Sequence, residues 1–429
     1  MQTVYLATYF DPIYWNTACL RVDSGLEEEA STNYGKIAKA VGNVMSHDIA
    51  MSLIDINKSQ YLFEPDIDNG TILYGMKALN GVGGEIIQQI VQNRPYDSFE
   101  DFLNKVKCTK TVVLALIKSG AFDKFEDREK LMRHYIGMIS EPKKRITMQN
   151  FNGLNERNLI PDELDLQKRT FVFNKALKHV LIDGMYVIKD NFYDFYEQFF
   201  DLDLLEPYGE ALAIPKDTWK KKCYDKMMAP AKEWITKNKH ESLEKLNGKL
   251  FEETWNKYAA GTISSWEMEA LGFYYTRHEL ININNLKYGI KEYMFLPEEP
   301  MVDREFKRNG LYIPLFETCR IAGTVIAKDD VKSLVSILTP MSGVVHVKFN
   351  RDYYAKYNRR ISEPQPDGTK KVREAGWFQR GTLIVVNGFR RGDTFVAKKY
   401  KSTESHQLYK ITKIKENGDI EMTNKRWGE

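Results

Sequence analysis

The feature that most constrains this chain is the change of hydrophobic periodicity after Arg320. Apolar and polar residues then alternate in short runs, separated by turn residues, at 320–327, 333–339, 344–349, 382–389 and 394–400. A helical run, 351–358, stands between the third and fourth of these. Three strands, a helix and two strands is the order of an OB-fold, a five-stranded barrel that binds oligonucleotides. We therefore expect an OB-fold domain over 318–429, with an exposed basic insertion at 359–376.

The basic residues are concentrated in the same segment. The 429 residues carry a net charge of only +3, but 318–429 hold 22 Lys+Arg against 12 Asp+Glu, which leaves 40 against 47 elsewhere. A local charge of +10 beside a remainder of −7 is expected where one end of a chain meets a polyanion. The alternative is a lysine-rich solvated face without a partner.

Basic and aromatic residues of this segment are candidates for binding a single strand. The aromatic candidates for stacking on bases, at roughly 1–3 kcal/mol each, are Phe349, Trp377 and Phe389. The alternative for these aromatic residues is that they fill the interior of a small barrel. The basic candidates for following the sugar-phosphate backbone are Lys348, Arg351, Arg359, Arg360, Lys370, Lys371, Arg373, Arg390, Arg391, Lys398 and Lys399.

A second pattern precedes this domain. The β-like runs 61–63 and 71–74, joined by a turn ending in Asn69-Gly70, predict a β-hairpin. The glycine-rich loop 79–84 then leads into a helical run. Glycines let the backbone approach an anion closely, and a helix start points free N–H groups at it. The alternative is an ordinary turn between helices.

Two further helical runs, 99–106 and 111–118, follow this loop. Together with it they predict a tandem helix-hairpin-helix arrangement, which contacts nucleic acid through backbone phosphates and independently of sequence. The candidate DNA contacts are Lys77, Asn80, Gly81, Val82, Gly83, Gly84, Lys118, Ser119 and Gly120.

Composition excludes several other classes of protein. A length of 429 residues indicates about three domains, and a hydrophobic content of 43% excludes a disordered chain. No apolar run approaches the roughly 18 residues of a membrane span, and the start lacks a secretory signal, so we expect a cytoplasmic protein without a membrane partner. The cysteines lie far apart, which argues against disulfides and zinc, at Cys19, Cys108, Cys223 and Cys319.

No catalytic group of residues is recognisable. Asp66-Ile67-Asp68 superficially resembles a two-metal carboxylate motif, but Asn69-Gly70 follows directly and favours a turn. The seven histidines form no ligand cluster, and no nucleophile or phosphate-loop fingerprint is present. We therefore predict that this chain holds no catalytic residue, no metal ion and no cofactor.

Two stretches carry no clear chemistry. The first twenty residues, MQTVYLATYFDPIYWNTACL, are aromatic and lack a helix cap, which predicts that they belong to a larger core or dock on another polypeptide. Residues 126–265 are mixed in composition. Their aromatic-dense part, 171–200, is interpreted as a helical core.

The order of these parts resembles the C-terminal half of the bacterial C-family replicative DNA polymerases, the DNA polymerase III α subunits. MQTVYLATYF is similar to the end of the family's fingers domain, and ILYGMKALNGVGGEIIQQIVQNR resembles its I-x-Y-G-L-x-x-I-K-G-V-G segment. DSFEDFLNKV and TVVLALIKSGAFD are similar to its helix-hairpin-helix continuation. WEMEALGFYYTRHEL resembles E-x-E-x-L-G-F-Y-L-S-G-H-P-L, with Arg277 and Glu279 in place of Gly and Pro, and CRIAGTVIA opens the OB domain.

The resemblance implies a multidomain α+β chain that is mainly helical in its N-terminal two-thirds. Residues 1–50 would be the end of the fingers domain, and 51–125 the tandem helix-hairpin-helix domain. Residues 126–300 would form a mainly helical connecting domain, and 318–429 the OB-fold domain.

The resemblance also implies that the palm, with its metal-binding aspartates, lies upstream of Met1. We then expect the DNA-holding part of a split or truncated polymerase of bacterial or bacteriophage origin. It would hold template-primer duplex and single-stranded template during replication and be inactive alone. A palm-bearing chain would be its partner, would carry out nucleotidyl transfer and would hold Mg²⁺.

Three further expectations remain open at this point. The family's sliding-clamp motif, Q-x-x-L/M-F, makes a clamp a candidate partner, with Met148-Gln149-Asn150-Phe151 as a poor match to it. The alternative to the polymerase part is an independent accessory module that binds single-stranded DNA. A third class is a stand-alone metal nuclease.

Overall fold

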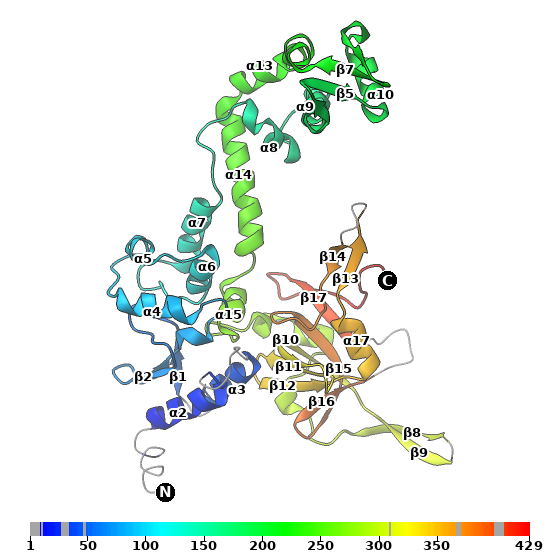
Figure 1. Ribbon diagram of the computed structural model, residues 1–429. Helices are drawn as coiled ribbons and strands as arrows, with labels where there is room; N and C mark the ends of the chain where they lie inside the picture. Colours follow the sequence, from blue (N-terminus) through cyan, green and yellow to red (C-terminus); the bar gives the residue numbers. More distant parts are fainter. Residues whose placement is uncertain are drawn as a thin grey trace. The chain divides into compact units, whose positions relative to one another are not determined.

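The computed structural model describes residues 9, 12–26, 34–45, 49–308, 310–365, 370–398 and 407–429 (Figure 1). The chain forms two compact units: unit 1 combines Met1–Met132 with Gly261–Glu429, and unit 2 is the intervening Arg133–Ala260. Both contain helices and strands, which confirms the α+β class. The expected connecting domain, 126–300, is divided between the two units.

The C-terminal part of unit 1 is a closed five-stranded barrel. Its strands are β10 (Cys319–Asp329), β11 (Leu334–Thr339), β12 (Gly343–Lys348), β15 (Leu383–Arg391) and β16 (Thr394–Ala397). The first three pair in antiparallel order, β12 pairs with β16 in parallel, and β15 pairs with both β16 and β10 to close the barrel. Helix α17 (Arg351–Asn358) follows β12. The OB-like fold is thereby confirmed.

The alternating sequence explains this closure. In β12, Val345 and Val347 are buried in the barrel core, whereas Val344 and His346 lie on the outer face. Trp377, which directly follows the basic insertion 359–376, is fully buried in the same core. Each strand therefore contributes one apolar face to the interior.

Three β-hairpins lie outside the five barrel strands. The hairpin β8 (Val302–Arg308) and β9 (Leu311–Phe316) precedes it and extends away from it (Figure 1). Within the insertion, β13 (Ile361–Pro364) pairs with β14 (Lys370–Glu374). After the barrel, β17 (Leu408–Ile414) and β18 (Ile420–Thr423) continue the sheet from β15. The sequence analysis did not identify these strands.

The N-terminal part of unit 1 is mostly helical. It contains α2 (Pro12–Ser24), α3 (Tyr34–Met45), η1 (Met76–Ala78), α4 (Gly84–Gln92), α5 (Phe99–Lys105), α6 (Lys110–Lys118) and the start of α7 (Arg128–Ile139). A small sheet joins β1 (Ala50–Ser52), β3 (Thr71–Leu73) and β2 (Glu64–Asp66). The expected strand at 61–63 is therefore displaced to Glu64–Asp66, because Phe63 is fully buried and packs its ring edge-on against Tyr74.

In the sequence after unit 2 and before the barrel strands, the chain forms α15 (Ile263–Leu271), η7 (Glu279–Asn282), α16 (Asn285–Tyr288) and η8 (Tyr293–Phe295). Helix α15 is capped at its start by Thr262 and ends at Gly272, whose φ of +84° is left-handed. This segment contacts both the helical part and the barrel of unit 1.

Unit 2 combines a four-stranded sheet with helices. The sheet has the order β4 (Leu181–Ile182), β5 (Met185–Ile188), β7 (Ala211–Pro215), β6 (Glu206–Tyr208). The helical segments are η2 (Met148–Asn150), α8 (Phe151–Glu156), η3 (Asp162–Leu164), α9 (Asp165–Leu177), η4 (Lys178–Val180), α10 (Asp190–Phe199), η5 (Leu202–Leu204), α11 (Lys216–Thr218), η6 (Trp219–Tyr224), α12 (Asp225–Met227), α13 (Ala229–Lys237) and α14 (Lys239–Tyr258). None of the helices in the described ranges has the length and apolar content that a membrane span requires.

A buried ion pair joins the two stretches of chain that make up unit 1. Glu267 of α15 is fully buried, and its Oε1 accepts a hydrogen bond from Nη1 of Arg128 at 3.1 Å. Its Oε2 accepts from the backbone N–H groups of Tyr275 and Thr276 at 2.9 and 2.8 Å. Arg128 also pairs with Asp123. Every charge in this group therefore has a partner, as burial requires.

Replacing Arg128 with Met should strongly destabilise unit 1. The Glu267 carboxylate would stay buried without its cation, which costs about 3 kcal/mol or more. Lys245→Met is a matched control, because it breaks an ion pair with Glu241 in which the side chains are 58% and 63% exposed. Urea unfolding should show a large drop for Arg128→Met and little change for the control. Equal losses in both variants would contradict the structural role of the pair.

His278 connects the segment after α15 to the barrel. Its Nδ1 accepts a hydrogen bond from the backbone N–H of Leu280 at 3.1 Å, so its Nε2 carries the hydrogen and donates to the carbonyl oxygen of Leu338 at 2.9 Å. Burial lowers the pKa of His278 from 6.5 to about 4. The neighbouring Tyr274 hydroxyl is hydrogen-bonded to Thr324 of β10 at 2.7 Å.

Unit 1 should lose stability as the pH falls from about 6.5 to about 4, because the unfolded chain protonates His278 in this range and the folded chain does not. The loss attributable to His278 is roughly 3 kcal/mol at most. Glu279 acts in the opposite direction, because burial raises its pKa. Denaturant unfolding at several pH values should therefore show a weaker acid dependence for His278→Gln. The exposed His240→Gln control should keep the wild-type dependence, and an unchanged His278→Gln profile would refute the assignment.

Candidate nucleic-acid interface

The first candidate surface is the loop that leads into α4. Gly81 has φ +82°, in the left-handed region that favours glycine, and Gly83 is the N-cap residue of α4. No atom lies within 4 Å of the position that a Cβ on Gly83 would take. The start of the helix is therefore open to an approaching phosphate, although Glu85 adds a negative charge to its first turn.

The same loop is held in place from α15. The backbone N–H of Asn80 donates to the carbonyl oxygen of Ala270 at 3.1 Å, and the Tyr34 hydroxyl donates to Oδ1 of Asn80 at 3.3 Å. Val82 is buried, so its side chain packs inward while Gly81 and Gly83 are exposed. The loop is thus a rigid turn with an accessible backbone.

The second hairpin lies between α5 and α6. Thr109 is the N-cap residue of α6, and its side chain accepts a hydrogen bond from the backbone N–H of Val112 at 3.5 Å. Lys107 and Lys110 are exposed beside it, and the first turn contains no acidic residue. The sequence analysis missed these two lysines, although a capping threonine between two lysines at a helix start is a readable signal.

The two hairpins lie side by side. The position that a Cβ on Gly81 would take is 3.6 Å from Cγ2 of Thr111, in the first turn of α6. The loop before α4 therefore lies beside the first turn of α6, and Lys107 and Lys110 are exposed at the start of α6. This geometry suits neighbouring phosphates of one nucleic-acid strand.

The other expected contacts of this domain lie elsewhere. Lys118 is buried, and its Nζ donates to Oε2 of Glu269 at 2.6 Å, while the Ser119 hydroxyl donates to the Leu116 carbonyl oxygen at 2.8 Å. Gly120 is also buried and closes α6 with a φ of +79°. These three residues lie at the end of α6 and are buried within unit 1. Lys77 is half-buried and donates to the carbonyl oxygen of Leu26.

The three aromatic candidates of the barrel are buried. Phe349 and Trp377 belong to the barrel core, where Trp377 donates from Nε1 to Oε1 of Glu374 at 2.6 Å. Phe389 is 6% exposed and packs against Phe316 of β9, with 4.9 Å between the ring centroids. Phe349 and Trp377 therefore fill the barrel, as the alternative expected, whereas Phe389 packs on the outside of the barrel against the hairpin β8–β9.

Several basic candidates of the barrel are exposed, namely Lys348, Arg351, Arg359, Arg360, Lys370, Lys371 and Arg373. Arg373 forms an ion pair with Glu363 across the insertion hairpin, so its charge is partly compensated. Lys370 and Lys371 stand on the neighbouring strand positions of β14. Lys399 lies outside the described residues.

The remaining basic candidates surround the turn between β15 and β16. Arg390 donates to the carbonyl oxygens of Gly392 and Leu296 at 2.9 and 3.1 Å, so it serves the fold of the turn. Arg391 and Lys398 instead lie over the ring of Phe389, at 5.5 and 5.4 Å from its centroid. This turn is one of the loops with which OB-folds bind oligonucleotides.

Acidic residues and the expected clamp segment were also located. Oδ2 of Asp66 accepts a hydrogen bond from Nδ2 of Asn69 at 2.7 Å, and this bond lowers the pKa of Asp66 within the turn after β2. In the described part of the chain, no group of three or more His, Cys, Asp or Glu residues is placed to hold a metal ion. Phe151, the aromatic residue of the 148–151 segment, is fully buried in unit 2.

Comparisons with known proteins agree with this geometry. Residues 48–131 match the family model of the helix-hairpin-helix motif. The chain is 38% identical, over 449 aligned residues and 99% of its length, to the probable DNA polymerase YorL of Bacillus subtilis (strain 168) and to the DNA-directed DNA polymerase of Bacillus phage SPbeta. It is 30% identical over 146 residues, 33% of its length, to the DNA polymerase III subunit alpha of Helicobacter pylori (strain ATCC 700392 / 26695), covering 12% of that protein.

These matches confirm the predicted resemblance and support a DNA-binding role related to polymerases. The chain spans about a third of the length of the YorL and SPbeta relatives, which it covers to 34%. The match to the helix-hairpin-helix family coincides with the two adjacent hairpins of unit 1.

Replacing Lys107 and Lys110 together with Gln should weaken duplex DNA binding and reduce the slope of log K against log salt by about 2, because each lysine that contacts a phosphate contributes about 1. Fluorescence anisotropy over a salt series measures both quantities. Lys130→Gln, an exposed lysine outside the hairpins, should leave the slope unchanged. Lys118→Met should lower the melting temperature and leave the slope of log K against log salt unchanged. If Lys118→Met reduces this slope and the double variant of Lys107 and Lys110 does not, the assignment is wrong.

Proposed function

We propose that the chain corresponds to a C-terminal part of a C-family DNA polymerase and that it holds DNA for a palm-bearing polypeptide outside these 429 residues. The hairpins of unit 1 contact the template-primer duplex, and the barrel contacts the single-stranded template. Nucleotidyl transfer and the Mg²⁺ ions that it needs belong to the palm. The observation that carries this proposal is the adjacency of Gly81 and Thr111, which places the loop before α4 beside the first turn of α6.

The duplex contact follows from the chemistry of that surface. Backbone N–H groups at helix starts bind phosphates whatever the base sequence, which a replicating enzyme requires. The loop before α4 is held from α15 through Asn80 and Ala270, so its amides are oriented before DNA arrives. Such preorganisation lowers the entropic cost of positioning a primer end for reaction on the palm.

The single-strand contact is supported by the barrel. Its OB-like topology is a frequent platform for oligonucleotides, and the excess of basic residues lies in the same part of the chain. Lys370 and Lys371 of the insertion hairpin are exposed, and Arg391 and Lys398 beside the β15–β16 turn lie over the ring of Phe389. We propose these four as the phosphate contacts.

Primer extension distinguishes this function from its alternative, an independent module that binds single-stranded DNA. A palm-bearing polypeptide encoded with this chain should extend a primer faster and more processively when the chain is added. The chain alone should incorporate no nucleotide. A Lys107→Gln, Lys110→Gln variant provides the control, because it should stimulate less than the wild type.

Binding to single-stranded DNA without any effect on extension would favour the accessory module. Mg²⁺-dependent cleavage of DNA by the chain alone would favour a nuclease. Either result would overturn the proposed polymerase role.

A further inference from the structure

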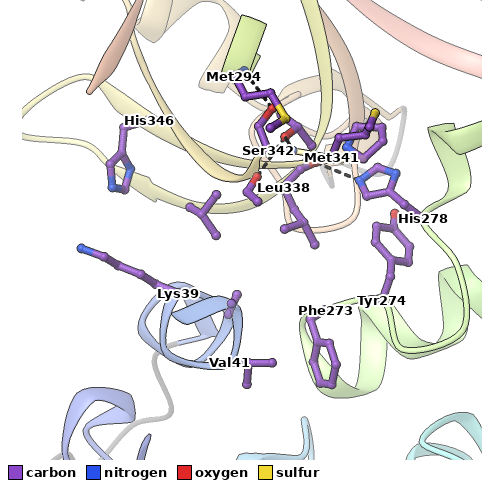
Figure 2. A pocket seen from close by; sticks show the side chains of 16 residues that line it. Lys39, Val41, Phe273, Tyr274, His278, Met294, Leu338, Met341, Ser342 and His346 are labelled. Atoms are coloured by element: carbon purple, nitrogen blue, oxygen red, sulfur yellow. Dashed lines mark hydrogen bonds between the residues drawn. The ribbon is translucent and has the colours of Figure 1, made fainter. Parts of the chain in front are cut away.

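A cleft lies between helix α3 and the turn that joins β11 to β12. It has a volume of about 670 Å³ and is bounded by α3, the segment 273–278, η8 and the outer face of the barrel. Figure 2 shows Lys39 and His346 at one end of the cleft and Tyr274 and His278 at the other. A volume of this size is typical of sites that take a small organic group.

The walls are apolar and held in place. Val41 of α3 is 1% exposed and Phe273 is 4% exposed, and both line the cleft with Leu338 of β11. The hydrogen bond from His278 to the carbonyl oxygen of Leu338 fixes the far wall to the barrel. The apolar walls therefore come from α3, the segment after α15 and the barrel.

The rim is different in character. The thioether side chains of Met294 and Met341 are 53% and 58% exposed at the cleft, and thioethers adapt to flat ligands of varied shape. Lys39 is exposed at the mouth, and no Asp or Glu is among the described residues that line the cleft. The site thus combines an apolar interior with a cation at its entrance, which suits a ligand that has a flat apolar part and an anionic part.

The polar groups of the turn are largely occupied by one another. The Thr339 hydroxyl donates to the Gly343 carbonyl oxygen at 3.1 Å and accepts from the Ser342 backbone N–H at 3.2 Å. The Ser342 hydroxyl oxygen accepts from the Met294 backbone N–H at 3.0 Å. The cleft therefore offers van der Waals contact more than hydrogen bonds that would read a particular base edge.

We propose that this cleft receives one unstacked base of a single DNA strand, with Lys39 on the adjacent phosphate. The proposal rests on the single-strand contact of the proposed function and names where it occurs. The cleft lies on the outer face of β11 and β12, the strands that correspond to the oligonucleotide face of OB-folds. Its apolar walls and engaged polar groups make binding tolerant of base identity, as copying any template requires.

Blocking the cleft tests the proposal directly. Gly42 of α3 lines it, and a Cβ built on Gly42 meets no atom within 4 Å, so a larger side chain has room to enter. Gly42→Trp should weaken binding of a single-stranded oligonucleotide by about tenfold or more and leave duplex binding unchanged. Gly42→Ala is the matched control and should bind both ligands like the wild type. Circular dichroism establishes that both variants fold.

A second variant tests the same cleft without placing a larger side chain in it. Lys39→Gln changes an exposed side chain and should reduce the salt slope of single-strand binding by about 1. Lys36→Gln, on the same helix but not lining the cleft, should leave that slope unchanged.

The outcomes separate the two levels of the proposal. A wild-type chain that does not bind single-stranded DNA would overturn the single-strand part of the proposed function, and the cleft assignment with it. Wild-type binding that neither Gly42→Trp nor Lys39→Gln changes would overturn the cleft assignment alone. A Gly42→Trp variant that binds single strands normally but no longer associates with the palm-bearing polypeptide would show a protein occupant and overturn the base site.

Discussion

The buried pair of Arg128 and Glu267 is the interaction on which the rest of unit 1 depends. The chain leaves this unit after Met132 and returns at Gly261, so a long excursion separates the two partners. Burying a carboxylate fully is costly unless each lone pair finds a donor, and here the guanidinium and two backbone N–H groups supply them. The pair thereby holds α15 against the helical part of unit 1. This contact does not involve any residue of unit 2.

The position of α15 in turn relates the two candidate nucleic-acid surfaces. The Tyr74 hydroxyl donates to the carbonyl oxygen of Leu271 at 2.6 Å, beneath the loop before α4. A few residues later, His278 donates to Leu338 of the barrel. A single stretch, 267–278, therefore contacts both the hairpin region and the barrel. This stretch contains most of WEMEALGFYYTRHEL, one of the segments whose sequence resembles the polymerase family.

The barrel could be predicted from sequence because its alternation is local, and each strand reports its own buried face. The hairpin loop before α4 was predictable for the same reason, through its glycines. The burial of Lys118 was not predictable, because it depends on an ion pair with Glu269, which is 151 residues away in sequence. Phe389 presented the same difficulty, since an aromatic residue on a strand looks alike whether it faces a base or a neighbouring hairpin such as β8–β9. The sheet of unit 2 was missed because its strands are two to five residues long and show no clear alternation.

The basic residues show most clearly why the sequence alone locates a nucleic-acid-binding surface only coarsely. Arg426 counts toward the basic excess of 318–429, yet it is 3% exposed and donates to four backbone carbonyl oxygens and to Glu374. Arg390 is similarly occupied. Lys370 and Lys371 differ from them in exposure and not in any sequence pattern. Binding through phosphates needs cations but no particular spacing, so no motif marks the ones that serve it. Only the structure separates the cations that hold the fold from those left to meet a ligand.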